Sequence, residues 1–236
     1  MGISINIATQ LARIGPHLRD CRRGVMLGRQ QMNLNRAGWK SELVRRLNAM
    51  GISCGIDDLL QDDGFCEKFL STVGFPPMES ADFTHLEGAE HVFDLGADLP
   101  SELEGQFDLV YDGGTTEHVF DIAQAFRNVD KMLKNGGIFL SNVGADGWYG
   151  HGFYQIGPDV PWRFWVASMG YEMIECVTYN RGDKSPPEPV PDPSGVYRGG
   201  EKSFSRPQFI FYAVRKLPRS APPEQVVQSH YIKFAQ

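Results

Sequence analysis

Residues 107–121 read FDLVYDGGTTEHVFD, an apolar run that passes at once into an acidic, glycine-rich turn. The apolar run is typical of a buried parallel strand, which is hydrophobic on both faces. Either threonine after the glycines can cap a helix, and Glu117 then lies in its first turn, where a carboxylate favours the helix dipole. We expect this helix to run from about 117 to 133, and a second apolar strand at 138–143 to follow the Gly-Gly pair that ends it.

The polar residues of this turn lie where α/β proteins bind their ligands. In an open α/β sheet, ligands occupy the crevice beyond the carboxyl ends of the parallel strands. Asp112, Gly113 and Gly114 end the strand or directly follow it, and His118 comes shortly after them. The sequence therefore predicts an α/β fold with these four residues at a ligand crevice.

The same stretch, continued by FRNVDKMLKNGGIFL, resembles the fourth strand, the following helix and the fifth strand of class I S-adenosylmethionine-dependent methyltransferases. The run GWYGHGFYQIGP at 147–158 resembles a segment after the fifth strand in one branch of that superfamily. The resemblance extends over roughly residues 25–216 and is most specific between 79 and 158. It implies a Rossmann-like methyltransferase fold with flanking helices and a mostly parallel seven-stranded sheet, whose last strand, here 208–215, lies antiparallel between the fifth and the sixth.

The composition is that of an ordinary globular protein. The chain has 236 residues, of which 42% are hydrophobic and 22% charged, and no apolar run approaches the ~20 residues that cross a bilayer. The start lacks the basic and apolar blocks of a signal peptide, so we expect a cytoplasmic protein without a membrane partner. We expect residues 1–216 to form one domain with a helical insert near 38–72, and residues 217–236 to form a C-terminal tail.

Neither the cysteines nor the charges indicate a metal site or a nucleic-acid partner. No C-x-x-C or H-E-x-x-H pattern occurs, so the sequence predicts no metal and free thiols at Cys21, Cys54, Cys66 and Cys176. The net charge is −6, but residues 1–50 carry nine basic and two acidic side chains, whereas residues 51–121 carry one basic and seventeen acidic ones. This acidic middle argues against a continuous nucleic-acid surface, and the sequence leaves a homo-oligomer open.

The first central strand should end at Gly28, and here the chain departs from the superfamily. The usual motif has an acidic residue two positions before the first glycine and two further glycines at alternate positions after it, but this chain has Met26, Gln30 and Met32 there. Such glycines let the backbone approach a ligand without an intervening Cβ. We expect Arg29 and Gln30 to supply side-chain hydrogen bonds to the cofactor instead. The alternative is that this loop no longer holds the methionine part of the cofactor.

Acidic residues end the second and the third expected strand. In nucleotide-binding α/β folds, a carboxylate at the end of the second strand accepts hydrogen bonds from the ribose hydroxyls. We assign that role to Asp82, with Glu79 as the alternative if the strand ends earlier. By the resemblance, Asp94 faces the adenine amino group, with Leu95 beside it. A surface carboxylate is the alternative for either acid.

The rest of the chain predicts elements around this crevice. Amphipathic patterns at 40–50 and 56–70 predict helices of the insert, which we expect to act as a lid, a partner surface or extra packing. Residues 181–200 contain five prolines and four glycines and should form a mobile loop, and the tail is either disordered or folded over the pocket or a neighbouring subunit. The remaining expected elements are helices at 7–18 and 161–169 and strands at 73–82, 91–95 and 171–179.

A glycine-rich loop after the fifth strand carries His151 between Gly150 and Gly152. Its aromatic residues suit the wall of a substrate pocket, and they are Trp148, Tyr149, Phe153 and Tyr154. The glycines allow the imidazole to face the pocket, and an ordinary pKa of about 6.5 suits proton removal near neutrality. We predict that His151 is the general base, or else fixes the loop through a backbone hydrogen bond. His118 is the second candidate base, with a structural or pocket-wall role as its alternative, and Tyr154 completes the predicted catalytic group.

Together with the resemblance, these residues predict an S-adenosylmethionine-dependent methyltransferase that releases S-adenosylhomocysteine. Methyl transfer needs few catalytic side chains, because the protein mainly aligns the two reactants and removes a proton from the acceptor. We expect a small-molecule acceptor that is methylated on a hydroxyl. The altered first loop leaves open a relative that catalyses another reaction, such as a cyclisation, or that binds the cofactor without transferring its methyl group. The long insert and the tail leave open a non-catalytic interaction protein.

Overall fold

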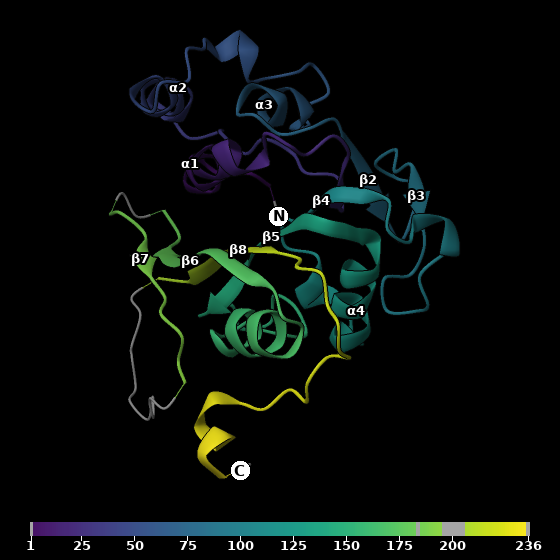
Figure 1. Ribbon diagram of the computed structural model, residues 1–236. Coiled ribbons are helices and arrows are strands. Elements are labelled where there is room, and N and C mark those ends of the chain that lie inside the picture. The colour runs from purple at the N-terminus through teal and green to yellow at the C-terminus, as the bar shows by residue number, and fades with distance from the viewer. Residues whose placement is uncertain (1, 183–184, 195–205, 235–236) are drawn as a thin grey trace.

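The chain folds around one mixed sheet, whose strands within the described residues follow the order β3-β2-β1-β4-β5-β8-β6-β7 (Figure 1). The computed structural model describes residues 2–182, 185–194 and 206–234. The strands from β3 to β5 in this order run parallel, whereas β8, β6 and β7 each run antiparallel to the preceding strand. The strands are β1 Gly24–Leu27, β2 Met78–Asp82, β3 His91–Val92, β4 Phe107–Asp112, β5 Leu133–Asp146, β6 Glu172–Asn180, β7 Glu188–Pro189 and β8 Gln208–Arg215.

β1 lies inside the parallel part of the sheet, with β2 on one side and β4 on the other. Leu27, the last residue of β1, is aligned with Ala81 of β2 on one side and with Asp112 of β4 on the other. This reversal of strand order is a topological switch point, and it opens a crevice beyond the carboxyl ends of the strands. The fold therefore places the turn after β4 at the predicted ligand edge.

Helices cover both faces of the sheet. The face that carries α1 also carries α2 and α3 of the insert, whereas α4 and η5 cover the opposite face (Figure 1). The longer helices are α1 Ile5–Ile14, α2 Trp39–Ala49, α3 Glu67–Thr72, α4 Ile122–Met132 and η5 Val160–Ser168. Short turns complete the set, at η1 Gly15–Leu18, η2 Ile56–Asp58, η3 Ser101–Leu103, η4 Thr116–His118 and η6 Ser229–Phe234.

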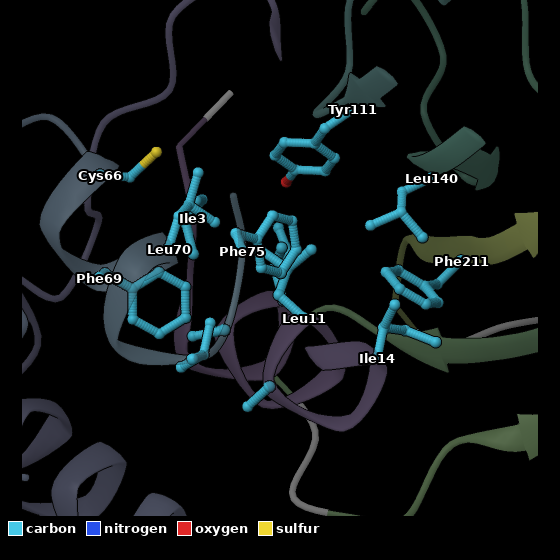
Figure 2. Packing of buried hydrophobic residues seen from close by; sticks show 14 of the residues in the cluster. Ile3, Leu11, Ile14, Cys66, Phe69, Leu70, Phe75, Tyr111, Leu140 and Phe211 are labelled. Atoms are coloured by element: carbon cyan, nitrogen blue, oxygen red, sulfur yellow. The ribbon is translucent and has the colours of Figure 1, made fainter. Parts of the chain in front are cut away.

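Two hydrophobic cores lie on the two faces, because successive side chains of a strand point to opposite sides. In β8, Phe209 and Phe211 belong to the core under α1, and Ile210 and Tyr212 belong to the core under α4 and η5. Both layers are therefore built from the same apolar strands, as the continuous apolar runs predict. Figure 2 shows the first core, in which residues around α1 and α3 meet the sheet, among them Ile3, Leu11, Ile14, Phe69, Leu70, Tyr111, Leu140 and Phe211.

The helix expected at 117–133 is interrupted, and this correction matters for the site. The short turn η4 ends at His118, the backbone is extended at Val119, and α4 begins only at Ile122. Asp121 caps α4, since its Oδ1 accepts a hydrogen bond of 3.0 Å from the backbone nitrogen of Gln124. The break separates Glu117 from α4, so this carboxylate is not the first-turn residue of a long helix.

The helix expected at 56–70 is also wrong as a single element. It divides into η2 and α3, and the connection between them includes Gly64, which has a φ of +79°. Asp63 stabilises that turn, because its Oδ1 accepts a hydrogen bond of 3.1 Å from the backbone nitrogen of Phe65. The apolar periodicity correctly predicted the buried side chains Phe69 and Leu70. It did not predict the turn at Gly64, which divides the helix.

The other expected helices and strands are present, although β2 begins only at Met78 and β3 ends at Val92, and one strand is added. β8 spans Gln208–Arg215 and lies between β5 and β6, as the resemblance implied. The extra strand, β7, pairs with β6 inside the predicted loop 181–200, of which residues 183–184 and 195–200 lie outside the described part. Among the described residues, no helix is long and apolar enough to cross a membrane.

Candidate functional site

Two clefts meet at the carboxyl ends of β1, β2 and β4. The first, called the polar cleft, has a volume of about 400 Å³ and is lined mainly by polar groups, among them Gly28, Arg29, Gln31, Asn33, Asp82 and Thr115. The second, called the apolar cleft, has a volume of about 280 Å³ and is lined mainly by apolar side chains, among them Ala81, Phe83, Phe93, Leu95, Val119 and Phe120. Asp82 and Thr115 line both clefts.

Gly28 holds the β1 turn against the turn after β4. Its φ is +71°, a conformation that favours glycine, and a Cβ at this position would lie 2.9 Å from Oγ1 of Thr115. Thr115 in turn donates a hydrogen bond of 2.6 Å to the carbonyl oxygen of Leu27. The retained glycine is therefore explained by backbone conformation and by a close approach between two turns.

Gln30, which replaces one of the lost glycines, and its neighbour Arg29 both make contacts within the protein. Gln30 is buried, and its Nε2 donates to the carbonyl oxygen of Gly28 over 3.2 Å. Gly113 makes room for it, because a Cβ at Gly113 would lie 2.5 Å from Cδ of Gln30. Arg29 forms ion pairs with Glu67 over 2.6 Å and with Asp63 over 3.0 Å. The structure thus brings Arg29 to the polar cleft but shows its guanidinium engaged with the insert.

Asp112 organises the turn from inside. It is fully buried, and its Oδ1 accepts hydrogen bonds of 3.1 Å and 2.8 Å from the backbone nitrogens of Gly114 and Thr115. Its Oδ2 accepts from the hydroxyls of Thr116, over 2.6 Å, and Ser141, over 3.1 Å. Asp112 therefore lies beneath the crevice, and Gly114 is the member of this turn that lines the polar cleft.

The acidic residues at the ends of β2 and β3 reach the clefts. Asp82 lies where the two clefts meet, and its Oδ1 accepts a hydrogen bond of 3.2 Å from the backbone nitrogen of Thr84. Asp94 and Leu95 both line the apolar cleft, and Oδ1 of Asp94 accepts a hydrogen bond of 2.8 Å from the backbone nitrogen of Gly96. These turns fix both carboxylates at the crevice.

Glu79, the alternative to Asp82, lies elsewhere. It receives a hydrogen bond of 2.9 Å from Nη2 of Arg23, and its Oε2 lies 2.6 Å from Nε2 of His91. The Arg23 guanidinium lowers the pKa of this carboxyl to about 2, with His91 contributing less. Glu79 lines neither of the two clefts, so the geometry favours Asp82 as the crevice acid.

The glycine-rich loop after β5 brings His151 to the turn that carries Glu117. The backbone nitrogens of Phe153 and Tyr154 donate hydrogen bonds of 2.9 Å and 3.2 Å to the carbonyl oxygen of Glu117. Gly152 allows this contact, because a Cβ there would lie 2.8 Å from the same carbonyl oxygen. The loop thereby places Nε2 of His151 4.0 Å from Oε1 of Glu117.

Glu117, His118 and His151 form one cluster. One ligand atom from each, a carboxylate oxygen and two ring nitrogens, lie within 4.8 Å of one another. The two imidazole rings meet edge to face, with their centroids 4.9 Å apart. His118 lines the apolar cleft, whereas His151 lines a third cleft, so the cluster lies between the two.

Burial dominates the electrostatics of this cluster. The side chain of Glu117 is 1% exposed, and burial raises its pKa to about 8, with the nearby Asp112 adding to the shift. Burial also lowers the pKa of His118, assisted by the charge of His151, and lowers the pKa of His151, assisted by the charge of Arg181. Both shifts favour the neutral imidazole. The sequence did not indicate Glu117 as a site residue, because the only signal for such a role was its position next to His118.

The third cleft adjoins this cluster and is lined by aromatic and basic side chains. Its volume is about 380 Å³, and its lining includes Arg36, Trp148, His151, Tyr179, Arg181 and Phe209. It shares Gly2 and Asn33 with the polar cleft, so the three clefts form a continuous arrangement. Neither Arg36 nor Arg181 forms an ion pair with an acidic residue in the described part of the chain.

Tyr154 is placed differently from the two histidines. Its hydroxyl donates a hydrogen bond of 2.8 Å to the carbonyl oxygen of Phe120, and it lines none of the three clefts. The ring of Phe153 packs 5.5 Å from that of Phe120, and both rings are largely exposed. The structure therefore shows Tyr154 as an anchor of the loop at the rim of the apolar cleft.

Comparisons with known proteins found one family model and several solved structures that are similar to this chain. A family model described as a methyltransferase domain matches residues 79–141, which include β2, β4 and α4. No curated protein matches the chain. Among solved structures, the N-methyltransferase NodS from Bradyrhizobium japonicum WM9 is 14% identical, with 90% of this chain and 96% of that chain covered and a TM-score of 0.44.

Two further structures are similar at the same level. An S-adenosylmethionine-dependent methyltransferase from Mesorhizobium loti is 13% identical, with 90% and 98% covered and a TM-score of 0.47. The 1,6-didemethyltoxoflavin-N1-methyltransferase of Burkholderia thailandensis is 11% identical, with 91% and 78% covered and a TM-score of 0.45.

Proposed function

We propose that this chain, an S-adenosylmethionine-dependent methyltransferase, methylates a hydroxyl group of a small molecule. The observation that carries the proposal is the meeting of the polar and the apolar cleft at Asp82 and Thr115. S-adenosylmethionine has a flat aromatic base at one end, a zwitterionic amino acid at the other, and a ribose between them. The apolar cleft, the junction at Asp82 and the polar cleft follow one another along the crevice in the same order.

The adenosine half fits the apolar cleft. The base would lie among apolar side chains such as Leu95 and Val119, with Asp94 near its amino group. The ribose would lie at Asp82, where one carboxylate oxygen is already held by Thr84 and the other lies on the side of Gly28. A carboxylate there can accept from a ribose hydroxyl.

The methionine half fits the polar cleft. Backbone at Gly28 and Gly114 and the side chains of Gln31 and Asn33 offer hydrogen bonds for an amino group and a carboxylate. Gln30 packs over Gly113, so the side chain that replaces a glycine at this position does not close the polar cleft. This favours cofactor binding over the alternative in which the loop has lost that role.

The acceptor would occupy the third cleft. Aromatic walls at Trp148, Tyr179 and Phe209 suit a planar or apolar molecule, and Arg36 and Arg181 favour one that carries an anionic group. The methyl group would pass from the junction of the polar and the apolar cleft toward the third cleft, on the side where His118 and His151 meet. We assign the promotion of acceptor deprotonation to this pair of histidines.

The test uses the purified full chain. Calorimetry with S-adenosylmethionine and S-adenosylhomocysteine should detect saturable binding, and mass spectrometry should detect a gain of one methyl group in hydroxylated aromatic acids from a compound panel. No heat and no thermal shift with either ligand at millimolar concentration would overturn the proposal. Binding with breakdown of the cofactor or cyclisation of a panel compound, but without methylation, would favour the alternative chemistry.

A further inference from the structure

We propose that Glu117, His118 and His151 bind a divalent transition-metal ion. The three side chains come from two segments, the turn η4 and the loop after β5, that hydrogen bonds hold together. Their ligand atoms already lie within 4.8 Å of one another. The site is therefore assembled by the fold rather than by neighbouring positions on one helix.

Glu117 supplies the main physical reason for the proposal. Its side chain is 1% exposed, and neither carboxylate oxygen has a hydrogen-bond partner among the described residues. Nε2 of His151, which faces it over 4.0 Å, is likewise buried and without a hydrogen-bond partner there. Leaving such groups unpaired in the interior costs free energy, and a cation between them would satisfy all of them.

The geometry and the donor set both suit a transition metal. Bonds of about 2.0–2.2 Å from nitrogen and oxygen place adjacent ligand atoms roughly 3–3.5 Å apart, so the ligand atoms need to approach one another by at most roughly 1–2 Å. Two imidazoles and one carboxylate favour Zn²⁺, Fe²⁺ or a similar ion over Mg²⁺ and Ca²⁺, which prefer oxygen ligands. Three protein ligands also leave coordination positions open for water or for a substrate oxygen.

The role of the metal rests on the proposed function. The ion would lie between the cleft that holds adenosine and the cleft that holds the acceptor. A hydroxyl oxygen bound to it would lose its proton to water more readily, because a cation stabilises the oxyanion. That oxygen then forms a bond to the methyl carbon, the carbon–sulfur bond breaks, and its electron pair stays on sulfur. The histidines would thus promote deprotonation as ligands rather than as free bases.

The experiment measures metal binding without cofactor. Chelator-treated full-length protein is titrated with Co²⁺, whose visible absorption reports nitrogen and oxygen ligation, and with Zn²⁺ in a calorimeter. We expect one equivalent to bind, and Glu117→Gln and His151→Ala each to weaken the affinity at least ~100-fold. His17→Ala is the matched control, because His17 is exposed and lies outside the cluster. Circular dichroism checks that each variant is folded, and His118→Ala provides a third ligand variant.

The possible outcomes test the existence of the metal site separately from its role in methyl transfer. Failure of the wild-type protein to bind either ion, or equal affinity in the ligand variants, would overturn the metal site even if cofactor binding is intact. Methyl transfer that survives complete metal removal would overturn the catalytic role but leave the site. Cofactor affinity, measured on the same metal-free protein, reports on the proposed function independently.

Discussion

At the scale of single residues, Glu117 shows how burial changes the meaning of a side chain. In the sequence it resembles an ordinary first-turn acid, which solvent would ionise. In the structure it is buried under the loop that carries His151, with Asp112 close enough to raise its pKa further. Its properties therefore depend on a contact between residues far apart in the chain.

The raised pKa of Glu117 predicts a pH dependence of stability in the metal-free protein. Its folded-state pKa of about 8 exceeds the ordinary value of 4.5, so the folded protein keeps a proton that the unfolded chain releases in this range. The free energy of unfolding should therefore fall as pH rises from about 5 to 8, with a slope of at most about 1.4 kcal/mol per pH unit from this group.

Glu117→Gln should remove that contribution. Urea unfolding of chelator-treated protein at several pH values should show a flatter profile for this variant than for the wild type. Glu102→Gln, which changes an exposed acid, is the control and should leave the profile as it is. Parallel profiles for wild type and Glu117→Gln would contradict the assignment.

A second residue-scale prediction concerns Asp82. Asp82→Ala removes the carboxylate at the junction of the polar and the apolar cleft. A charge-assisted hydrogen bond contributes about 1.5–3 kcal/mol, so affinity for S-adenosylhomocysteine should fall at least about tenfold. Calorimetry measures the change, with Asp98→Ala as an exposed control that lines none of the three clefts. An unaltered dissociation constant in a folded Asp82→Ala protein would remove the ribose role.

At the scale of elements, two turns and one loop build the site. The β1 turn is tied to the β4 turn through Thr115, and the loop after β5 is tied to η4 through the carbonyl oxygen of Glu117. The strands set only the approximate positions of these turns and of the loop, and the hydrogen bonds between them fix the final arrangement. Glycine at the points of closest approach allows the backbones to meet.

Gly152→Ala tests the contact between the loop and η4. The new Cβ would lie 2.8 Å from a backbone oxygen of Glu117, which cannot move away by a side-chain rotation. We expect the loop to shift, the protein to lose about 1–3 kcal/mol of stability, and Co²⁺ affinity to fall.

Gly157→Ala is the matched control for that variant. Gly157 lies near the end of the same loop, and a Cβ there would have no atom within 4 Å. Thermal unfolding and cobalt absorption should both stay close to the wild-type values. Equal behaviour of the two variants would show that the close approach at Gly152 does not position His151.

At the scale of the whole molecule, the C-terminal segment secures the face opposite α1. Asp130 of α4 accepts hydrogen bonds of 2.8 Å from Tyr171 and 2.7 Å from Arg219, and Lys216 lies 3.4 Å away. Farther along, the backbone nitrogen of Ser229 donates to Asp159 over 3.0 Å. None of residues 217–234 lines the three clefts, so the segment supports the fold at a distance from the site (Figure 1).

Ending the chain after Lys216 should therefore reduce stability without changing cofactor affinity. Loss of Arg219 removes one of the partners of Asp130, and a hydrogen bond between charged groups contributes about 1.5–3 kcal/mol. We expect the melting temperature to fall by at least about 5 °C, while the dissociation constant for S-adenosylhomocysteine stays the same.

The Arg219→Ala variant separates this ion pair from the rest of the segment and should account for part of the loss. Scanning calorimetry and cofactor titration provide the two readouts. A large loss of cofactor affinity in the shortened but folded protein would contradict a single domain ending at residue 216.

The sequence by itself predicted most strands and helices of an α/β fold and the sheet edge at which its polar turns lie, and the resemblance added the place of the last strand. Apolar strand runs, capping residues and glycine turns are local signals, and they predicted β4, β8 and the crevice acids Asp82 and Asp94. They failed at the helix expected at 117–133, where the cap at Asp121 competes with a continuous apolar pattern. Local patterns show which residues prefer the buried face of a helix or strand. They therefore predict helices and strands well.

Only the tertiary structure decided which polar groups meet. Arg29 is engaged by acids of the insert, Asp112 lies under the turn, and Glu117 faces His151 across a loop contact. No spacing in the chain encodes these partners, because the distances depend on how the loop after β5 packs on η4. Burial and unsatisfied hydrogen bonds are properties of the packed chain, and they are what turn three scattered side chains into a candidate metal site.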